Sequence, residues 1–283
     1  MAATGAGRII RRYPCVGGID MAGTVAKSTD ARFKEGDAVI ATSYDIGVAH
    51  HGGYAEYGRV PADWVVPLPN GLSLQDAMAL GTAGYTAALA VVRMEENGLM
   101  PANGRVVVSG ATGGVGSIAV DILTRLGYEV VALTGKESQT EYLKGLGAKE
   151  VLLRSGLDLS KIKPLEKTLW AGRRGQSRRR CACLDGQQHE TERGDRQHRT
   201  GCEHEPQYDG GPFILRGASL LGIDSGYTVM SLRRKVWERL ATDMRPAHLA
   251  GMTRMVKLAE LPTVFDEFIK GQAHGRVVVD CAG

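Results

Sequence analysis

Hydrophobic and polar positions alternate in short runs over the first quarter of the chain and change to helical spacing after residue 72. The early runs lie at 23–27, 37–42, 52–60 and 63–69, and glycine or other turn residues separate them. Runs of this length and period are typical of short, half-buried strands. Residues 1–72 are therefore predicted to form a small, irregular β domain.

From Ser73 onward the pattern predicts helices that alternate with strands. Ser73 is a candidate N-cap for a helix that begins with LQDAMAL. Strands are then predicted over 105–110, 129–135 and 149–154, with helices over 116–127 and 137–147 between them. Because parallel strands need crossover helices, this alternation predicts an α/β fold with a doubly wound parallel sheet.

The end of the chain returns to ordinary periodicity. Residues 218–223 have the pattern of a last strand of that sheet, and a helix is predicted over 231–244. Residues 255–280 are expected to close the chain as a helix followed by a strand.

A glycine-rich turn follows the strand predicted at 105–110. Residues 110–116 read GATGGVG, directly after a strand and directly before a helix. Glycines in this position let the backbone turn tightly, and the free N–H groups of the helix start favour the pyrophosphate of a dinucleotide. A structural turn without a ligand is the alternative, but the strand–turn–helix context favours a dinucleotide site.

The end of the second strand indicates which dinucleotide is bound. NAD enzymes place an acidic residue there, whereas a basic residue accommodates the 2′-phosphate of NADP. This chain has Thr134, Gly135 and Lys136 at that point and no acid before Glu137. A solvated lysine at a helix start is the alternative, but lysine is disfavoured there by the helix dipole. NADPH is the predicted cofactor.

Composition is that of an ordinary globular protein. The 283 residues are 43% hydrophobic and 23% charged. The sequence has no apolar run of membrane-spanning length and no apolar leader at its start, so neither a membrane partner nor a secretory signal is expected. Its five cysteines show no repeated spacing, which favours a cytoplasmic location. The net charge of +4 is unevenly distributed, and no nucleic-acid partner is expected.

Several motifs together resemble the medium-chain dehydrogenase/reductase superfamily, and within it the zinc-free acryloyl-CoA reductase branch that is often labelled quinone oxidoreductase. They lie at 17–25, 52–60, 81–88, 106–123, 133–138 and 212–225. The resemblance implies a GroES-like catalytic domain made of 1–72 and 228–283, with a Rossmann domain over 73–227 inserted between them. It also implies a homodimer.

The activity implied is hydride transfer from NADPH to the conjugated double bond of a small α,β-unsaturated carbonyl compound, such as acryloyl-CoA. The alternatives are an NADPH:quinone reductase and a non-catalytic nucleotide-binding or metal-binding protein. By motif matching, the implied cofactor residues are Thr82 and Ala83 beside the nicotinamide, Thr112, Gly113, Gly114 and Val115 at the pyrophosphate, Thr134, Gly135 and Lys136 at the 2′-phosphate, Arg154 near the adenosine, and Ile214 and Ser225 flanking the cofactor.

Two departures from the superfamily affect the expected chemistry. Zinc-dependent relatives carry an early cysteine ligand, a Gly-His-Glu motif and a four-cysteine lobe, which are absent here, and His50 and His51 have no evident third ligand. No metal is therefore expected. The family also places an Asn-Tyr-Lys-Asp segment beside the nicotinamide, upstream of the point where this sequence begins. The sequence is thus expected to be N-terminally truncated, and no catalytic acid can be assigned.

The hydrophobic positions of residues 172–211 follow neither the helical nor the strand period. These residues contain no Val, Ile, Met, Phe or Trp, yet they hold three of the five cysteines and eight arginines. One explanation is a metal or nucleic-acid module built from Cys181, Cys183, His189, His198, Cys202, His204 and the basic run 173–180. The spacings match no common zinc pattern. A disordered insertion is a second explanation, although the segment is no longer than the family segment it replaces.

A shifted reading frame is the explanation we favour for this segment. Ordinary codons for Gln187–Arg199, read one nucleotide along, permit SNMKLNGVIASTG, which has the pattern of a helix end, a turn and a buried strand. Strands 4 and 5 of the Rossmann order 3-2-1-4-5-6 would then be lost. We accordingly expect 172–211 to be loosely structured and the strand at 218–223 to lack its neighbour.

Overall fold

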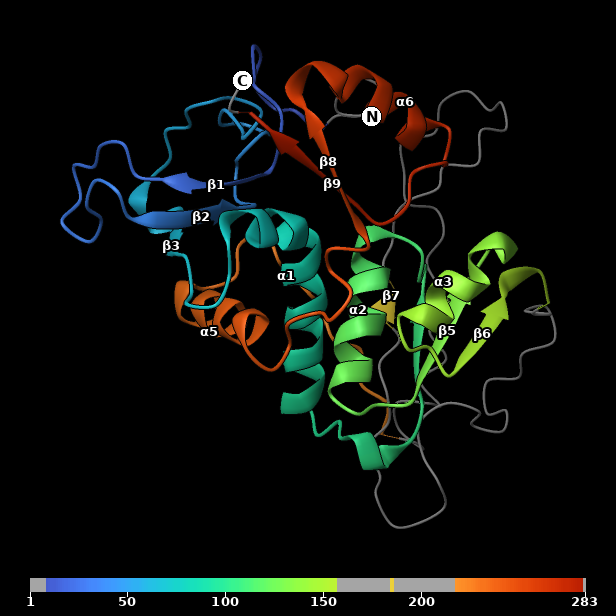
Figure 1. Cartoon of the computed structure of the whole chain (residues 1–283). Coiled ribbons are helices and arrows are strands. Elements are labelled where there is room, and N and C mark those ends of the chain that lie inside the picture. Colours follow the sequence, from blue (N-terminus) through green and yellow to red (C-terminus); the bar gives the residue numbers. More distant parts are fainter. Residues whose placement is uncertain (1–8, 157–183, 186–216, 282–283) are drawn as a thin grey trace.

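The computed structural model describes residues 9–156, 184–185 and 217–281. Two lobes meet along the first turns of a long central helix (Figure 1). The upper lobe in that view holds an antiparallel sheet in the order β1-β2-β3, formed by β1 (Asp20–Thr24), β2 (Ala38–Thr42) and β3 (Val65–Pro67). The same lobe holds the parallel pair β8 (Thr253–Lys257) and β9 (Arg276–Asp280), with α6 (Leu261–Ile269) between them in sequence.

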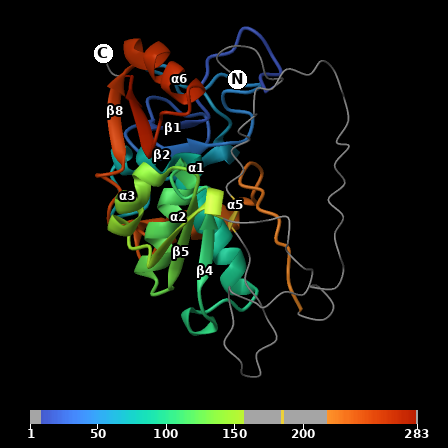
Figure 2. The same cartoon turned by 90° about the vertical axis from the view of Figure 1, so that its right-hand side faces the viewer.

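The second lobe contains the parallel sheet, in the order β6-β5-β4-β7. Its strands are β4 (Val106–Ser109), β5 (Val130–Thr134), β6 (Glu150–Leu153) and β7 (Leu184–Asp185). The crossovers are α2 (Gly114–Arg125) and α3 (Thr140–Gly145). This order corresponds to strands 3-2-1-4 of a Rossmann sheet, so the expected fold class is confirmed. Turning the molecule by 90° shows the helices stacked on the sheet (Figure 2).

The described part of 172–211 is limited to β7, which pairs with β4 over Val108–Ser109 at the position of strand 4. The expectations for the rest of that segment lie outside the described residues. One strand prediction was wrong, because residues 219–223 belong to no helix or strand. An edge strand still needs a ladder partner on its inner side, and the neighbour expected here was to come from within 172–211.

The central helix α1 (Leu74–Glu96) begins where the sequence predicted. The Ser73 hydroxyl accepts a hydrogen bond from the Asp76 N–H at 3.0 Å, and the Asp76 carboxylate accepts one from the Ser73 N–H. The helix is interrupted at Gly81, whose φ of 51° and ψ of −155° are not helical. The helix is apolar and long enough to cross a membrane, but 72% of its most apolar window is buried inside the protein, as in a core helix.

The core lies between α1, α2 and the parallel sheet, where Leu80, Tyr85, Ile118, Ile122 and Val130 are all inaccessible to solvent. Short 3-10 turns connect the elements at Ala62–Trp64, Pro101–Asn103, Glu137–Gln139, Arg154–Gly156 and Leu258–Glu260. The strand β8 was missed by the sequence reading, whereas the helix predicted at 231–244 is α5 (Met230–Ala241).

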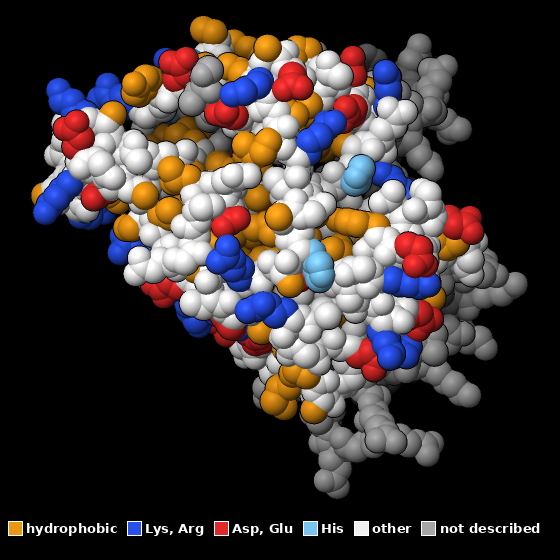
Figure 3. All heavy atoms as spheres, in the orientation of Figure 1, with side chains coloured by type: hydrophobic (Ala, Val, Ile, Leu, Met, Phe, Trp, Pro, Cys, Tyr) orange, Lys and Arg blue, Asp and Glu red, His pale blue; other side chains and the backbone are white. Residues whose placement is uncertain are grey.

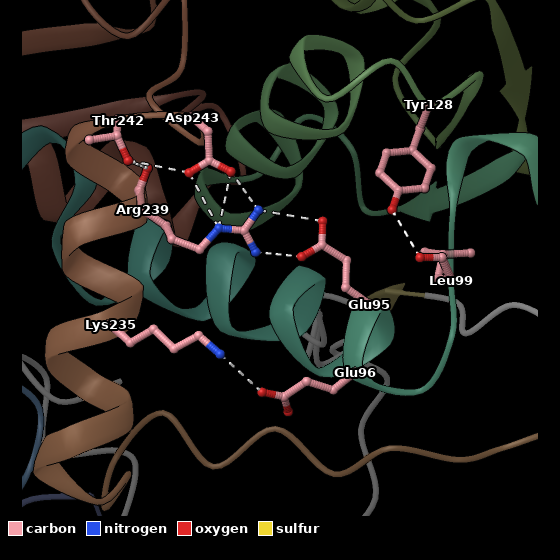
Figure 4. A network of polar contacts seen from close by, with 8 residues as sticks. All are labelled: Glu95, Glu96, Leu99, Tyr128, Lys235, Arg239, Thr242 and Asp243. Carbon is pink, nitrogen blue, oxygen red and sulfur yellow. Dashed lines mark hydrogen bonds and ion pairs between the residues drawn. The ribbon is translucent and has the colours of Figure 1, made fainter.

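Ion pairs join α5 to the end of α1 (Figure 4). Arg239 contacts Glu95 of α1 and also Asp243, whose Oδ2 lies 2.5 Å from its Nη2. Lys235 lies 3.5 Å from Glu96 in a more exposed pair. These contacts hold α5 against the C-terminal end of α1. The division into domains at residues 72 and 228 stays a prediction.

Candidate functional site

The glycine turn is built by close contacts that exclude side chains. Gly110 has a φ of 58°, and a Cβ on Gly116 would collide with the Gly110 carbonyl oxygen, so the start of α2 packs directly on the strand end. Gly113 is the N-cap of α2, and its terminus has no side-chain cap. The first-turn N–H groups are consequently available to an anion. Thr112, which is part of this turn, is buried, with 7% of its surface exposed.

The residues expected at the 2′-phosphate lie together at the ends of β5 and β6. The Thr134 hydroxyl accepts a hydrogen bond from the Lys136 N–H at 3.0 Å. Arg154 faces Gly135, where a Cβ would lie 3.5 Å from its Nη2. Parallel strands end at one edge of their sheet, which brings Arg154, the residue directly after β6, next to the turn after β5. A lysine and an arginine can both bind a phosphate, and recognition of a 2′-phosphate at this point stays a prediction.

The segment 271–276 runs from this edge to the glycine turn. Lys136 donates to the carbonyl oxygens of Gly271 at 2.9 Å and Ala273 at 3.5 Å. Further along, a Cβ on Gly114 would lie 3.5 Å from the Gly275 carbonyl oxygen and 3.1 Å from Arg276 Nη1. One short segment of the upper lobe thus lies alongside several of the predicted cofactor residues of the lower lobe.

Arg276 is a residue that the sequence reading missed. Its Nε donates to the Ala79 carbonyl oxygen of α1 at 2.7 Å, and burial lowers the pKa of its guanidinium. The sequence carried one signal, because an arginine directly precedes the apolar run Val277–Val279 in this strand. A guanidinium held against a glycine turn can form paired hydrogen bonds with a phosphate.

Thr82 lies immediately after the interruption of α1 and contacts Asp20 of β1. Its N–H donates to Asp20 Oδ1 at 3.0 Å, and its hydroxyl donates to the same oxygen at 2.5 Å. The Ser43 and Thr82 hydroxyl oxygens are 2.9 Å apart. Burial raises the pKa of Asp20, although the Thr82 hydrogen bonds and the charges of Arg276 and Arg233 favour its ionised form.

Gly81 lies between the side chains of Asp20 and Arg276. A Cβ on this glycine would lie 2.6 Å from Asp20 Oδ2 and 2.8 Å from Arg276 Nη2. Because Arg276 also reaches Gly114, the nicotinamide-side residues and the glycine turn are connected through one guanidinium. Neither Thr82 nor Ala83 is fully buried, so both can face a bound molecule.

The backbone next to Thr82 is strained. Ser43 and Tyr44 have φ values of 66° and 51°, in a region that residues other than glycine seldom adopt. The buried Arg233 side chain stabilises this turn through cation–π contacts. Its guanidinium lies 4.5 Å from the Tyr44 ring centroid and 4.8 Å from the Tyr85 ring centroid. Arg233 also donates to the carbonyl oxygens of Thr42, Ser225 and Gly226 at 3.0–3.3 Å.

Ser225 therefore joins the group around Ser43 through Arg233, and Ile214 lies outside the described residues. Near Ser225, an open cavity of about 640 Å³ is lined by Leu89, Arg93, Ile223, Asp224, Tyr227 and Leu232. Hydrophobic atoms are also exposed along the junction of the two lobes, with charged side chains toward the periphery (Figure 3).

The histidine pair makes structural contacts. His51 Nδ1 accepts from the Val16 N–H at 3.1 Å, and the His50 ring packs edge-on against Trp64. Within the described ranges, no three His, Cys, Asp or Glu side chains are arranged to hold a metal ion. The cysteines and histidines of the metal-module explanation fall outside those ranges.

The chain is similar to known proteins over nearly its whole length. Residues 2–70 match the family described as alcohol dehydrogenase GroES-like domain. The putative quinone oxidoreductase YhfP of Bacillus subtilis is 46% identical over 99% of this chain and 85% of its own length. The acrylyl-CoA reductase AcuI of Ruegeria pomeroyi is 43% identical over 97% of this chain and 83% of its own.

Solved structures show the same similarity. The crystal structure of Bacillus subtilis yhfP with NAD bound superposes with a TM-score of 0.83 at 43% identity, covering 96% of this chain and 83% of that one. The yhdH oxidoreductase from Salmonella enterica in complex with NADP has a TM-score of 0.83 at 38% identity, with coverage of 99% and 86%.

Proposed function

The chain belongs to the medium-chain dehydrogenase/reductase superfamily of NAD(P)-dependent oxidoreductases, and we propose that it is an NADPH-dependent reductase of small α,β-unsaturated carbonyl compounds such as acryloyl-CoA. The observation that carries this proposal is the alignment of three expected cofactor subsites. Lys136 contacts the segment 271–276, and Arg276 within that segment lies beside Gly114 of the glycine turn and beside Gly81, the residue before Thr82.

The residues present suit a dinucleotide with a 2′-phosphate. The uncapped start of α2, with glycines where a Cβ would collide, would hold the pyrophosphate, and Arg276 would add paired hydrogen bonds. Lys136 and Arg154 would hold the 2′-phosphate. Related structures contain NAD in one case and NADP in another, so the preference for NADPH depends on these two cations.

When bound, the reduced cofactor supplies a hydride, and the proposed acceptor is the β-carbon of the conjugated double bond. The protein's part is to orient the two molecules and exclude water. The similarity to AcuI supports the acryloyl thioester as substrate. A homodimer and a cytoplasmic location belong to the same proposal.

An NADPH:quinone reductase is the second candidate, because the relative YhfP is described as a putative quinone oxidoreductase. Steady-state oxidation of NADPH with acryloyl-CoA and with 1,4-benzoquinone separates the two. We expect faster turnover of acryloyl-CoA at equal concentration. Turnover of the quinone alone would contradict the proposed substrate.

A non-catalytic nucleotide-binding or metal-binding protein is the candidate from a different class. Tight binding of NADPH without turnover of either acceptor would favour nucleotide binding. Zinc retained at one equivalent after dialysis would favour a metal site built from residues such as Cys181 and His204.

A further inference from the structure

Three oxygen-bearing side chains form a continuous hydrogen-bonded chain beside the proposed nicotinamide site. Ser43 contacts Thr82 with 2.9 Å between the two hydroxyl oxygens, and Thr82 contacts Asp20 with 2.5 Å between its hydroxyl and Oδ1. These residues come from the strained turn after β2, the start of the second part of α1, and β1. Ser43 is only 7% exposed, whereas Thr82 and Asp20 are both half-buried.

We propose that Thr82 is the catalytic residue that protonates the α-carbon of the reduced substrate, with Asp20 as the source of its proton and Ser43 as a positioning residue. This inference rests on the proposed function. It addresses a step for which the sequence offered no candidate, because reduction of a conjugated double bond needs a proton as well as a hydride.

The direction of the hydrogen bonds depends on the protonation of Asp20. When Asp20 is ionised, Thr82 donates its only hydroxyl proton to the carboxylate and has none to give. When Asp20 is protonated, its O–H donates to Thr82, and the Thr82 proton is free to point toward a substrate. The Thr82 N–H, which donates to Asp20 Oδ1 at 3.0 Å, keeps the pair aligned in both states.

The proposed step balances in protons and electrons. Hydride addition at the β-carbon leaves an enolate, whose electron pair forms a new C–H bond at the α-carbon. The O–H bond of Thr82 breaks as that bond forms, and Thr82 takes the proton of the Asp20 carboxyl group. Asp20 then regains a proton from water, so the enzyme returns to its starting state.

The surroundings of Asp20 affect how readily its carboxyl group loses a proton. Burial raises its pKa, and Tyr54 nearby also has a raised pKa. The charges of Arg276 and Arg233 oppose this effect. Arg276 faces Asp20 across Gly81, and Arg233 packs against the turn that contains Ser43. Arg276 donates to the Ala79 carbonyl oxygen and also lies beside Gly114 of the glycine turn, so Asp20 is only one of the groups that its guanidinium faces.

The position of the relay matches the proposed reaction. Thr82 follows Gly81, and Arg276 spans the short distance from Gly81 to Gly114 at the glycine turn. A cofactor whose pyrophosphate lies at that turn would extend its nicotinamide end toward the start of the second part of α1. A substrate stacked against the nicotinamide would meet the Thr82 hydroxyl.

The test uses Thr82→Ala, Thr82→Ser and Asp20→Asn in the full chain, with Thr263→Ala on the exposed face of α6 as a matched control. General acid catalysis typically contributes about 10²–10⁴-fold to a rate. We expect Thr82→Ala to lower kcat for acryloyl-CoA by about 10²-fold with little change in the Kd for NADPH. Thr82→Ser should retain most of the activity, and Thr263→Ala should equal the wild type.

Two further readouts separate catalysis from structure. Wild-type kcat should fall as the pH rises and Asp20 ionises, and Asp20→Asn should abolish that pH dependence together with most of the activity. The solvent deuterium isotope effect on kcat should change in Thr82→Ala. Reduction of 1,4-benzoquinone places protons on oxygen, which water can supply, so the variants should lose far less of this activity than of the activity with acryloyl-CoA.

The outcomes distinguish the two proposals. Wild-type turnover of acryloyl-CoA with unchanged kcat in Thr82→Ala would overturn the relay and leave the proposed function intact. Equal losses with acryloyl-CoA and benzoquinone would also overturn it, because they indicate damage to cofactor binding. A wild-type chain that reduces only the quinone would refute the proposed substrate, and the relay with it.

Discussion

Asp20 combines two opposing influences, hydrogen-bond donors that favour its charge and burial that disfavours it. Burial is the larger and raises its pKa. A carboxyl group with a raised pKa in the folded state makes its full contribution to stability below its unfolded pKa. That contribution is lost as the pH rises through the folded pKa.

We therefore predict that Asp20→Asn becomes more stable relative to the wild type as the pH rises from 4 to 8. The asparagine retains an oxygen that can accept from Thr82 but cannot ionise. Urea unfolding at several pH values measures the difference, and Asp63→Asn, at a side chain 81% exposed, is the matched control. A stability difference that is constant across this range would contradict the prediction.

Lys136 is expected to discriminate between the two nicotinamide cofactors. Its ammonium group now contacts two backbone carbonyl oxygens of 271–276 and can exchange them for a phosphate. We predict that Lys136→Ala weakens NADPH binding about tenfold, roughly 1.4 kcal/mol, and leaves NADH binding unchanged. Isothermal titration calorimetry measures both, with Lys144→Ala on the exposed face of α3 as the control. Equal losses for both cofactors would exclude a role in recognising the 2′-phosphate.

Sequence motifs predicted some of these residues and missed others. Thr134, Lys136 and Arg154 could be predicted because they lie at the ends of strands whose order follows from the fold. Asp20 and Arg276 could not be predicted in this way, because their contacts join β1 and β9 to α1 across large sequence separations. Local periodicity gives no information on which distant strands meet.

At the scale of elements, the interruption of α1 is the feature that positions the site. Helical spacing and the Ser73 cap predicted the helix, but the pattern continues through Gly81 without a break. The chain bends there because glycine alone permits its φ of 51° with Asp20 and Arg276 so close.

We predict that Gly81→Ala destabilises the protein by about 3 kcal/mol, since alanine would be strained in this conformation and would overlap both side chains. Gly145→Ala in α3 is the control, because nothing lies within 4 Å of its Cβ position. Thermal unfolding of both variants measures the contrast. A Gly81→Ala protein as stable as the control would indicate that the interruption is not required.

The contacts between α5 and α1 offer a second prediction at this scale (Figure 4). Arg239 is 23% exposed and joins two carboxylates, whereas Lys235 and Glu96 are about half exposed. We predict a loss of ~1 kcal/mol for Arg239→Ala and less than ~0.5 kcal/mol for Lys235→Ala. Chemical denaturation checks the order, which would be contradicted if the two losses were equal.

At the scale of the whole molecule, the parallel sheet and its order were predictable, because alternating strands and helices permit few topologies. The strand expected at 218–223 is not formed over 219–223, and the described residues of 172–211 contribute only the two-residue strand β7, which pairs with β4 and not with this segment. The way the 271–276 segment connects the lobes could not be predicted, because it depends on how β9 returns to the first domain.

The central claim is that this chain transfers hydride from NADPH to the β-carbon of a conjugated thioester. The most direct measurement is the reduction of acryloyl-CoA by NADPH deuterated at both C4 positions, with the product analysed by NMR. We predict one deuterium at C3 of the propionyl group and a solvent-derived proton at C2. Absence of product, or deuterium at any position other than C3, would contradict the claim.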